Sequence, residues 1–146
     1  DALTDLPNRA YLMERLRACL AHSRREQNYR FGLLFVDVDN FKLINDSLGH
    51  RIGDQLLMHM AAMMMSVLGV IRTSSRRSQD TVARFGGDEF VVLLDDVGDA
   101  DNVLRIAERI PREDPGIVFQ HDERARGSGG ALAGHRRYLL LCLEQQ

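Results

Sequence analysis

The sequence is poor in the residues on which several classes of protein depend. It has two cysteines, Cys19 and Cys142, three prolines, no tryptophan and a single lysine among nineteen basic residues. Two cysteines so far apart indicate neither a disulfide framework nor a cysteine metal site. Acidic and basic residues nearly cancel, to a net charge of -2, so the chain lacks the basic footprint of a nucleic-acid-binding protein. We therefore expect no nucleic-acid partner.

Long hydrophobic runs are absent as well. The one segment that suggests a membrane span, residues 56–71, contains His59 and Ser66. A span needs about 20 mostly apolar residues, so we expect a buried helix there and no membrane contact by this domain. With 146 residues and 45% hydrophobic content, the chain is long enough for one domain with a substantial core.

Hydrophobic periodicity predicts a chain that contains both helices and strands. Helices are expected over residues 8–25, 40–47, 53–69 and 100–109, and strands over residues 31–36, 81–85 and 90–94. Gly49-His50 is expected to turn the chain between the second and third helices. After the first helix the order is β-α-α-β-β-α. This order is typical of a palm-type, ferredoxin-like α+β fold, in which helices pack on an antiparallel-containing sheet.

The most informative motif is the segment 84–90, in which Gly86 and Gly87 precede the carboxylates of Asp88 and Glu89. It lies between two strand-like runs, so these four residues are expected at the tip of a β-hairpin, where glycine would supply a positive φ. Glycine also lets backbone N–H groups approach a phosphate, and acidic side chains beside a phosphate require a cation between them. A solvated turn is the alternative for these four residues alone.

A second acidic pair, Asp37 and Asp39, follows the apolar run 31–36. In extended chain, residues two apart project to the same side, here at the carboxyl end of a buried strand. If the hairpin tip lies beside this end, Asp37, the Val38 carbonyl and Asp88 can hold one or two divalent ions over a triphosphate. Asp39 could instead cap the next helix, and we assign it mainly that role.

Together, spaced motifs in a fixed order give the chain a family resemblance. The matching segments are residues 1–9, 37–46, 49–50, 53–54 and 86–90. In this order they resemble the GGDEF family of diguanylate cyclases. The resemblance implies a domain that condenses two GTP molecules into cyclic di-GMP and pyrophosphate, with Mg²⁺ (or Mn²⁺) as cofactor. It also implies a homodimer, because each domain would hold one GTP.

The resemblance assigns the acidic residues to catalysis. It implies that Asp37, the backbone of Val38 and Asp88 bind the metal. It further implies that Glu89 lies beside them and that Asp88 or Glu89 helps to deprotonate the attacking 3′-hydroxyl. Phosphoryl transfer depends mainly on positioning and charge neutralisation, which agrees with a site of carboxylates and a metal without a covalent nucleophile.

Substrate binding is assigned to residues around the second predicted helix. The resemblance implies that Asn45 and Asp54 recognise guanine, whose O6 accepts and whose N1–H and N2–H₂ donate, whereas adenine would leave both side chains unpaired. Lys42 is the only lysine and follows the acidic pair closely, so we expect it to contact a phosphate; a plain surface lysine is the alternative. Gly86 and Gly87 complete the predicted substrate contacts.

A possible regulatory motif precedes the hairpin. Arg77 and Asp80 have the R-x-x-D spacing and position of the family's inhibitory site, at which cyclic di-GMP would bind. A guanidinium can hold a phosphate or guanine through two hydrogen bonds, and a carboxylate can accept from N1–H and N2–H₂. A surface ion pair is the alternative. An insertion within residues 72–77 adjoins the motif and could displace Arg77.

The resemblance covers residues 1–110, which we take as an incomplete GGDEF domain. Residues 111–146 lack the family's final strand and helix, which carry a Lys/Arg pair on the triphosphate, and form a Gly- and Arg-rich tail expected to be partly disordered. Within that tail, residues 138–143 could form a terminal strand or helix. If they did not, the strand over residues 31–36 could be left as an exposed, aggregation-prone edge.

Two interpretations of function therefore remain open. The first is a cyclase domain whose turnover is reduced by loss of the carboxy-terminal part. The second is a non-catalytic module that binds GTP or cyclic di-GMP and regulates an attached domain, because binding tolerates that loss better than turnover does. A polymerase is disfavoured by the missing basic channel. The chain starts with Asp1, so we expect a piece of a longer cytoplasmic protein or the cytoplasmic part of a membrane-attached sensor.

Overall fold

The described residues of the computed structural model are 1–38, 40–71, 79–98, 100–110 and 137–143. Four helices and four strands lie within these ranges. In chain order they are α1 (Arg9–Ser23), β1 (Phe31–Asp37), α2 (Phe41–Leu48), α3 (His50–Ile71), β2 (Thr81–Arg84), β3 (Glu89–Leu94), α4 (Ala100–Arg109) and β4 (Arg137–Leu143).

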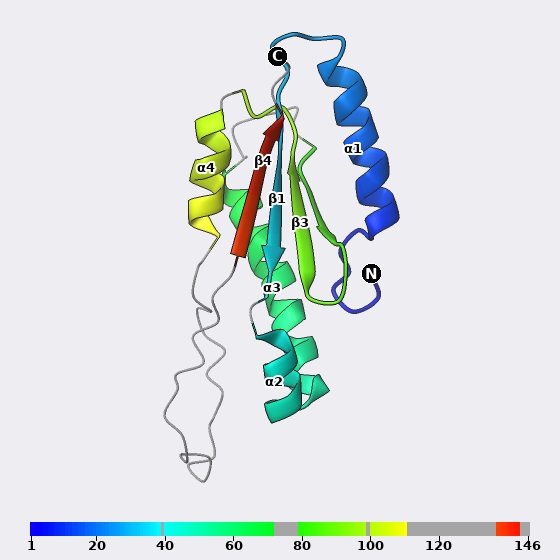
Figure 1. The fold of residues 1–146 in the computed structure, drawn as a ribbon, viewed down its shortest axis with the longest axis vertical. Coiled ribbons are helices and arrows are strands. Elements are labelled where there is room, and N and C mark those ends of the chain that lie inside the picture. The colour runs from blue at the N-terminus through cyan, green and yellow to red at the C-terminus, as the bar shows by residue number, and fades with distance from the viewer. Residues whose placement is uncertain (39, 72–78, 99, 111–136, 144–146) are drawn as a thin grey trace.

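The strands form one antiparallel sheet in the order β2-β3-β1-β4. Figure 1 shows α1 and α4 on opposite sides of this sheet, with α3 running along it. This arrangement confirms the predicted α+β fold, in which helices pack on a small antiparallel sheet.

The sheet has a hydrophobic cluster on each face. Leu34 and Val36 of β1 pack in a cluster with α3 and α4 residues, whereas Phe31 and Leu33 pack in another with α1 residues such as Leu12. Successive side chains of a strand point to opposite faces, so a strand covered on both must be apolar throughout. The unbroken apolar run of β1 therefore reflects its central place.

Most of the predicted elements are confirmed, and one boundary is wrong. The first helix, the hairpin strands and the helix from residue 100 lie close to their predicted positions. However, α3 begins at His50 and not at residue 53. Gly49, with a φ of 87°, makes the whole turn after α2. Gly53 consequently lies inside the first turns of α3.

The end of the chain contributes a strand. Pairing along β1 runs from Phe31↔Leu143 to Asp37↔Arg137, so β4 covers the full length of β1. Of the two alternatives for residues 138–143, the strand is the one observed. The central strand β1 is therefore not an exposed edge. The rest of the tail, residues 111–136 and 144–146, lies outside the described residues.

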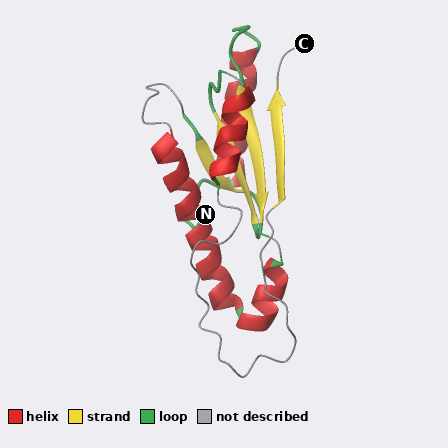
Figure 2. Ribbon diagram, turned by 90° about the vertical axis from the view of Figure 1, so that its left-hand side faces the viewer, coloured by secondary structure: helices red, strands yellow, loops and turns green. Residues whose placement is uncertain are grey.

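One end of the sheet gathers several segments. Figures 1 and 2 show α2 beyond the strands at the end where β1 finishes, and the β2–β3 turn lies near that end too. None of the helices in the described ranges is both long enough and apolar enough to cross a membrane.

Candidate functional site

The register of β1 and β3 brings the two acidic segments of the sequence side by side. Asp37 is the cross-strand partner of Glu89, and the Val38 N–H donates to the Asp88 carbonyl at 3.3 Å. Directly opposed residues of an antiparallel pair project to the same face, so the Asp37 and Glu89 carboxylates share a face. Both residues are exposed and Asp88 is half-buried.

The turn between β2 and β3 is closed by the Glu89 carbonyl, which accepts from the N–H groups of Phe85 at 2.8 Å and Gly86 at 3.3 Å. The expectation that these glycines supply a positive φ is wrong, because neither Gly86 nor Gly87 has one. Gly86 instead gives room: a Cβ there would lie 2.7 Å from Glu89 Oε2. The missing side chain lets the Glu89 carboxylate fold back over the turn.

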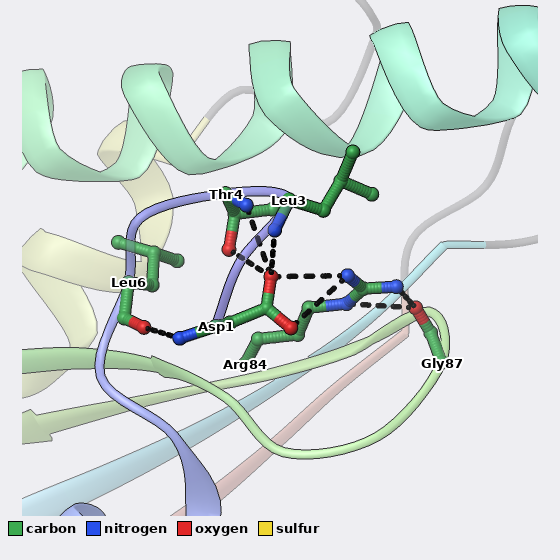
Figure 3. Close-up of polar contacts among 6 residues, drawn as sticks. All are labelled: Asp1, Leu3, Thr4, Leu6, Arg84 and Gly87. Atoms are coloured by element: carbon green, nitrogen blue, oxygen red, sulfur yellow. Dashed lines mark hydrogen bonds and ion pairs between the residues drawn. The ribbon is translucent and has the colours of Figure 1, made fainter.

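Arg84 ties this turn to the amino-terminal segment (Figure 3). Its Nε and Nη2 donate to the Gly87 carbonyl at 3.1 and 2.7 Å, and its Nη1 donates to both carboxylate oxygens of Asp1 at 3.1 and 3.3 Å. Asp1 Oδ1 also accepts from the Thr4 N–H and hydroxyl, each at 2.9 Å. Arg84 and Asp1 both lie within motifs of the sequence, but their contact could not be predicted, because no local pattern links residues so far apart.

The segment between β1 and α2 continues the site. The Val38 carbonyl accepts from the Phe41 N–H at 3.3 Å, where α2 begins. Asn40 is the N-cap residue, has a φ of 58° and makes no side-chain capping bond. Residue 39, which was predicted to cap this helix, lies outside the described residues. Lys42 is exposed in the first turn of α2.

The predicted guanine contacts lie on α2 and α3. Asp54 is exposed on α3, and Asn45 is partly buried on α2. The Asn45 Oδ1 atom is shielded from solvent and has no hydrogen-bond partner within the part of the chain that the structure describes. It lies over Gly53, where a Cβ would be only 1.9 Å away. Sequence reasoning gave Gly53 no separate role.

The acidic residues suit a particular kind of metal site. Within the described ranges, no three His, Cys, Asp or Glu side chains lie together so as to hold an ion. Mg²⁺ commonly uses one or two carboxylates and completes its shell with water and substrate phosphates. The carboxylates that meet at the end of β1 and the Val38 carbonyl are hard oxygen ligands of this type. These residues fit an ion shared with a bound phosphate, and not a closed protein cage.

Comparison with known proteins decides the family. The family model "Diguanylate cyclase, GGDEF domain" matches residues 1–133. The chain belongs to the GGDEF family. The matched range extends past residue 110, where the resemblance found in the sequence was taken to end.

Named relatives and a solved structure agree with this assignment. The chain is 46% identical over 112 residues to the diguanylate cyclase TpbB of Pseudomonas aeruginosa, covering 75% of this chain and 23% of TpbB. It is 38% identical over 132 residues to the bifunctional diguanylate cyclase/cyclic di-GMP phosphodiesterase MucR of the same species, covering 89% of this chain and 18% of MucR. It therefore spans less than a quarter of either relative. The crystal structure of the TpbB GGDEF domain superposes with a TM-score of 0.75 at 33% identity, covering 95% of this chain and 77% of that one.

At the opposite end of the GGDEF sheet lies a second polar cluster, centred on Asp95, which follows β3. Its Oδ1 accepts from the Tyr29 hydroxyl, and its Oδ2 accepts from Arg15 Nη2 and the Gln79 N–H, both at 3.4 Å. The Asp95 N–H in turn donates to Asp80 Oδ1 at 2.8 Å. We call these five residues the Asp95 cluster. It fixes Asp80 of the predicted inhibitory motif, whereas Arg77 lies outside the described residues.

Two buried groups beside Asp95 have raised pKa values. Burial, followed by the hydrogen bond to Asp95, raises the pKa of Tyr29 above its ordinary value. Burial also raises the pKa of the neighbouring Cys19 thiol, which lies 4.0 Å from Asp95 Oδ1. Both groups are therefore held in their neutral, protonated forms at neutral pH.

Proposed function

We propose that this chain is a catalytic domain that condenses two GTP molecules into cyclic di-GMP, as the names of its relatives suggest. The observation that carries the proposal is the pairing of Asp37 with Glu89 at the end of the sheet, beside the Asp88 backbone. This pairing gathers carboxylates where α2, the β2–β3 turn and the end of β1 meet. A nucleoside triphosphate and its metal ion need such a group of oxygen ligands.

The reaction requires two equivalent displacements. In each, the 3′-hydroxyl oxygen of one GTP attacks the α-phosphorus of the other and forms a phosphodiester bond. The bond between the α-phosphorus and the α–β bridging oxygen breaks, pyrophosphate leaves and the hydroxyl proton passes to a base. Since the two GTP molecules attack each other, two domains must face one another. We therefore propose a homodimer as the catalytic form.

The acidic residues have two tasks in this proposal. Asp37, the Val38 carbonyl and Asp88 would hold Mg²⁺ or Mn²⁺, and a bound ion would neutralise charge on the phosphates. Asp88 or Glu89 would take the proton of the attacking hydroxyl. Glu89 suits this task because it is exposed at the turn and its carboxylate has room over Gly86.

Recognition of the nucleotide is assigned to the neighbouring helices. Asn45 and Asp54 would hydrogen-bond the polar edge of guanine, and Lys42, exposed at the start of α2, would contact a phosphate. The backbone of Gly86 and Gly87 would line the phosphates. GTP is a cytoplasmic nucleotide, so the proposal places the domain in the cytoplasm.

Product inhibition is the regulatory part of the proposal. Asp80 would accept from guanine of cyclic di-GMP, with Arg77 as the guanidinium partner. The hydrogen bond from the Asp95 N–H supports this role for Asp80, because it fixes the position of the Asp80 carboxylate. Titration with cyclic di-GMP should lower turnover in the parent chain and not in the Asp80→Ala variant.

The decisive test is product formation. Purified chain incubated with GTP and Mg²⁺ should yield cyclic di-GMP, separated by chromatography, and Asp88→Ala should abolish it. Glu108→Ala is the matched control, because Glu108 is an exposed acidic residue on α4, away from the β2–β3 turn. Undiminished product from the Asp88→Ala variant would contradict the proposal. Binding of GTP without any product from the parent chain would favour the non-catalytic regulatory module.

A further inference from the structure

Gly53 occupies the point where α2 comes closest to the start of α3. A Cβ at this position would lie 1.9 Å from Asn45 Oδ1 and 3.3 Å from Phe41 Cε2. Gly69, in the same helix, is different: a Cβ there would meet nothing within 4 Å. Glycine is unfavourable inside a helix. At residue 53 it leaves the space that the Asn45 amide fills.

The side-chain carbonyl oxygen of Asn45, Oδ1, is unusual for a polar atom in this position. It is shielded from water and accepts no hydrogen bond from the described residues. Shielded acceptors are normally paired, because an unpaired one loses its hydration without compensation. Asn45 Oδ1 gains a hydrogen-bond partner when the amide rotates toward a donor on a bound ligand. That rotation needs the space above Gly53.

We propose that Gly53 is a positioning residue for guanine selection, because it leaves the space in which the Asn45 amide rests and turns toward the base. This inference rests on the proposed function, in which Asn45 contacts guanine. The chemical class that it selects is a purine with a donor and acceptor edge of the guanine type. Adenine has an acceptor at N1 and a donor at N6 where guanine has the reverse, so an amide oriented for guanine does not find the same partners on adenine.

If Gly53 were needed only for helix packing, Gly53→Ala would destabilise the fold, and we expect that it does not. The nearest atom to a new Cβ is the end of a flexible side chain and not backbone, so the Asn45 amide can move aside without moving α2. The Phe41 ring must move by only a few tenths of an ångström. Gly53→Ala should therefore fold, with its thermal midpoint close to that of the parent chain, and should displace the amide.

The first measurement observes the amide directly. In a ¹⁵N-labelled chain without ligand, Gly53→Ala should shift the side-chain NH₂ signals of Asn45, which are identified by their loss in Asn45→Ala. Gly69→Ala should leave those signals unchanged. Unchanged Asn45 signals in the Gly53→Ala variant would overturn the proposal. This measurement does not depend on nucleotide binding.

The second measurement observes base selection. The probes are the α,β-methylene analogues of GTP and ATP, which cannot release pyrophosphate, titrated calorimetrically with Mg²⁺. Gly53→Ala should weaken binding of the guanine analogue by about tenfold, the scale of one lost hydrogen bond, and reduce the preference over adenine by the same factor. Gly69→Ala should match the parent chain. Combined with Asn45→Ala, the Gly53→Ala change should add no further loss.

The possible outcomes separate the two proposals. If the parent chain binds neither analogue, the proposed function fails, and the selection role of Gly53 fails with it. If the parent binds the guanine analogue and Gly53→Ala binds it equally well with the same preference, only the role of Gly53 is overturned. Additive losses in the double variant would also overturn it.

Discussion

Carboxylates have contrasting surroundings at the two ends of the sheet. At the end near the β2–β3 turn, Asp37 and Glu89 lie opposite each other in register and are exposed to solvent. At the other end, the Asp95 side chain is only 15% exposed and accepts hydrogen bonds from Tyr29, Arg15 and Gln79. One end presents carboxylates to solvent, and the other uses a carboxylate to join α1, the chain before β1 and the chain before β2.

This difference distinguishes carboxylates that can bind a ligand from a carboxylate that stabilises the fold. A carboxylate that already accepts several hydrogen bonds stabilises its donors and has little capacity left for a ligand. Exposed carboxylates brought together by strand pairing contribute little to stability and can meet a cation. We therefore expect substitutions at the turn to change activity and substitutions in the Asp95 cluster to change stability.

Among the substitutions that test this comparison, Asp37→Asn should have the largest effect. Loss of one charged metal ligand should reduce cyclic di-GMP formation by at least about 100-fold, roughly 2.7 kcal/mol in the barrier. The free energy of unfolding, from urea denaturation, should change by less than about 1 kcal/mol, because the side chain is exposed. Turnover near that of the parent chain would break the comparison at its catalytic end.

Asp95→Ala should have the next largest effect, on stability. It removes the carboxylate that accepts from the Tyr29 hydroxyl and from Arg15 Nη2, which should lower the free energy of unfolding by about 2–3 kcal/mol. Urea denaturation followed by circular dichroism measures this loss. The exposed Glu108→Ala variant should change it by less than about 0.5 kcal/mol. Equal stability of the two variants would show that the Asp95 cluster is not a support.

Arg84→Ala should affect both properties, because Arg84 supports the turn itself. Its donors to the Gly87 carbonyl and to Asp1 are lost, at a cost of about 1–2 kcal/mol for a partly exposed group. Product formation should fall as the turn loses its fixed shape. Arg105→Ala, an exposed arginine on α4, serves as the control. A stable but inactive Arg84→Ala variant would show that the contact is needed for catalysis alone.

Alkaline pH tests the Asp95 cluster without mutation. The folded-state pKa of Tyr29 is raised above its ordinary value of 10.0, so its stabilising contribution is complete below pH 10. As the pH rises further, the unfolded chain loses the phenolic proton and the folded chain keeps it, so stability falls by up to about 1.4 kcal/mol per pH unit. Tyr29→Phe should lack this extra decline. Denaturation midpoints between pH 8 and 11 measure it, and identical pH profiles would contradict it.

The sequence was sufficient for the elements that have a local signal. The apolar run before Asp37 predicted a central strand, and the repeat of Val103 and Ile106 lies on the buried side of α4. The start of α3 was predicted too late, because Gly53 resembles a break in a helix. The side chain that leaves no room for a Cβ at residue 53 is Asn45 of another helix, which periodicity cannot reveal.

In the candidate site, too, only the features with a local sequence signal were predictable. Both acidic motifs could be found in the sequence, but the register that pairs Asp37 with Glu89 is set by long-range strand pairing. The conformation of the turn was predicted wrongly, because a glycine can be required for space as well as for a positive φ. The contacts of Arg84 with Asp1 and of Asp95 with Tyr29 join distant residues and have no local sequence signal.

The position of β4 has a consequence for how the chain folds. The pair Asp37↔Arg137 closes a loop of about a hundred residues, which makes this contact entropically costly and slow to form. During synthesis, the β4 side of β1 stays unpaired until the residues of β4 have been made. Truncation just before residue 137 should therefore leave a folding intermediate that associates through β1.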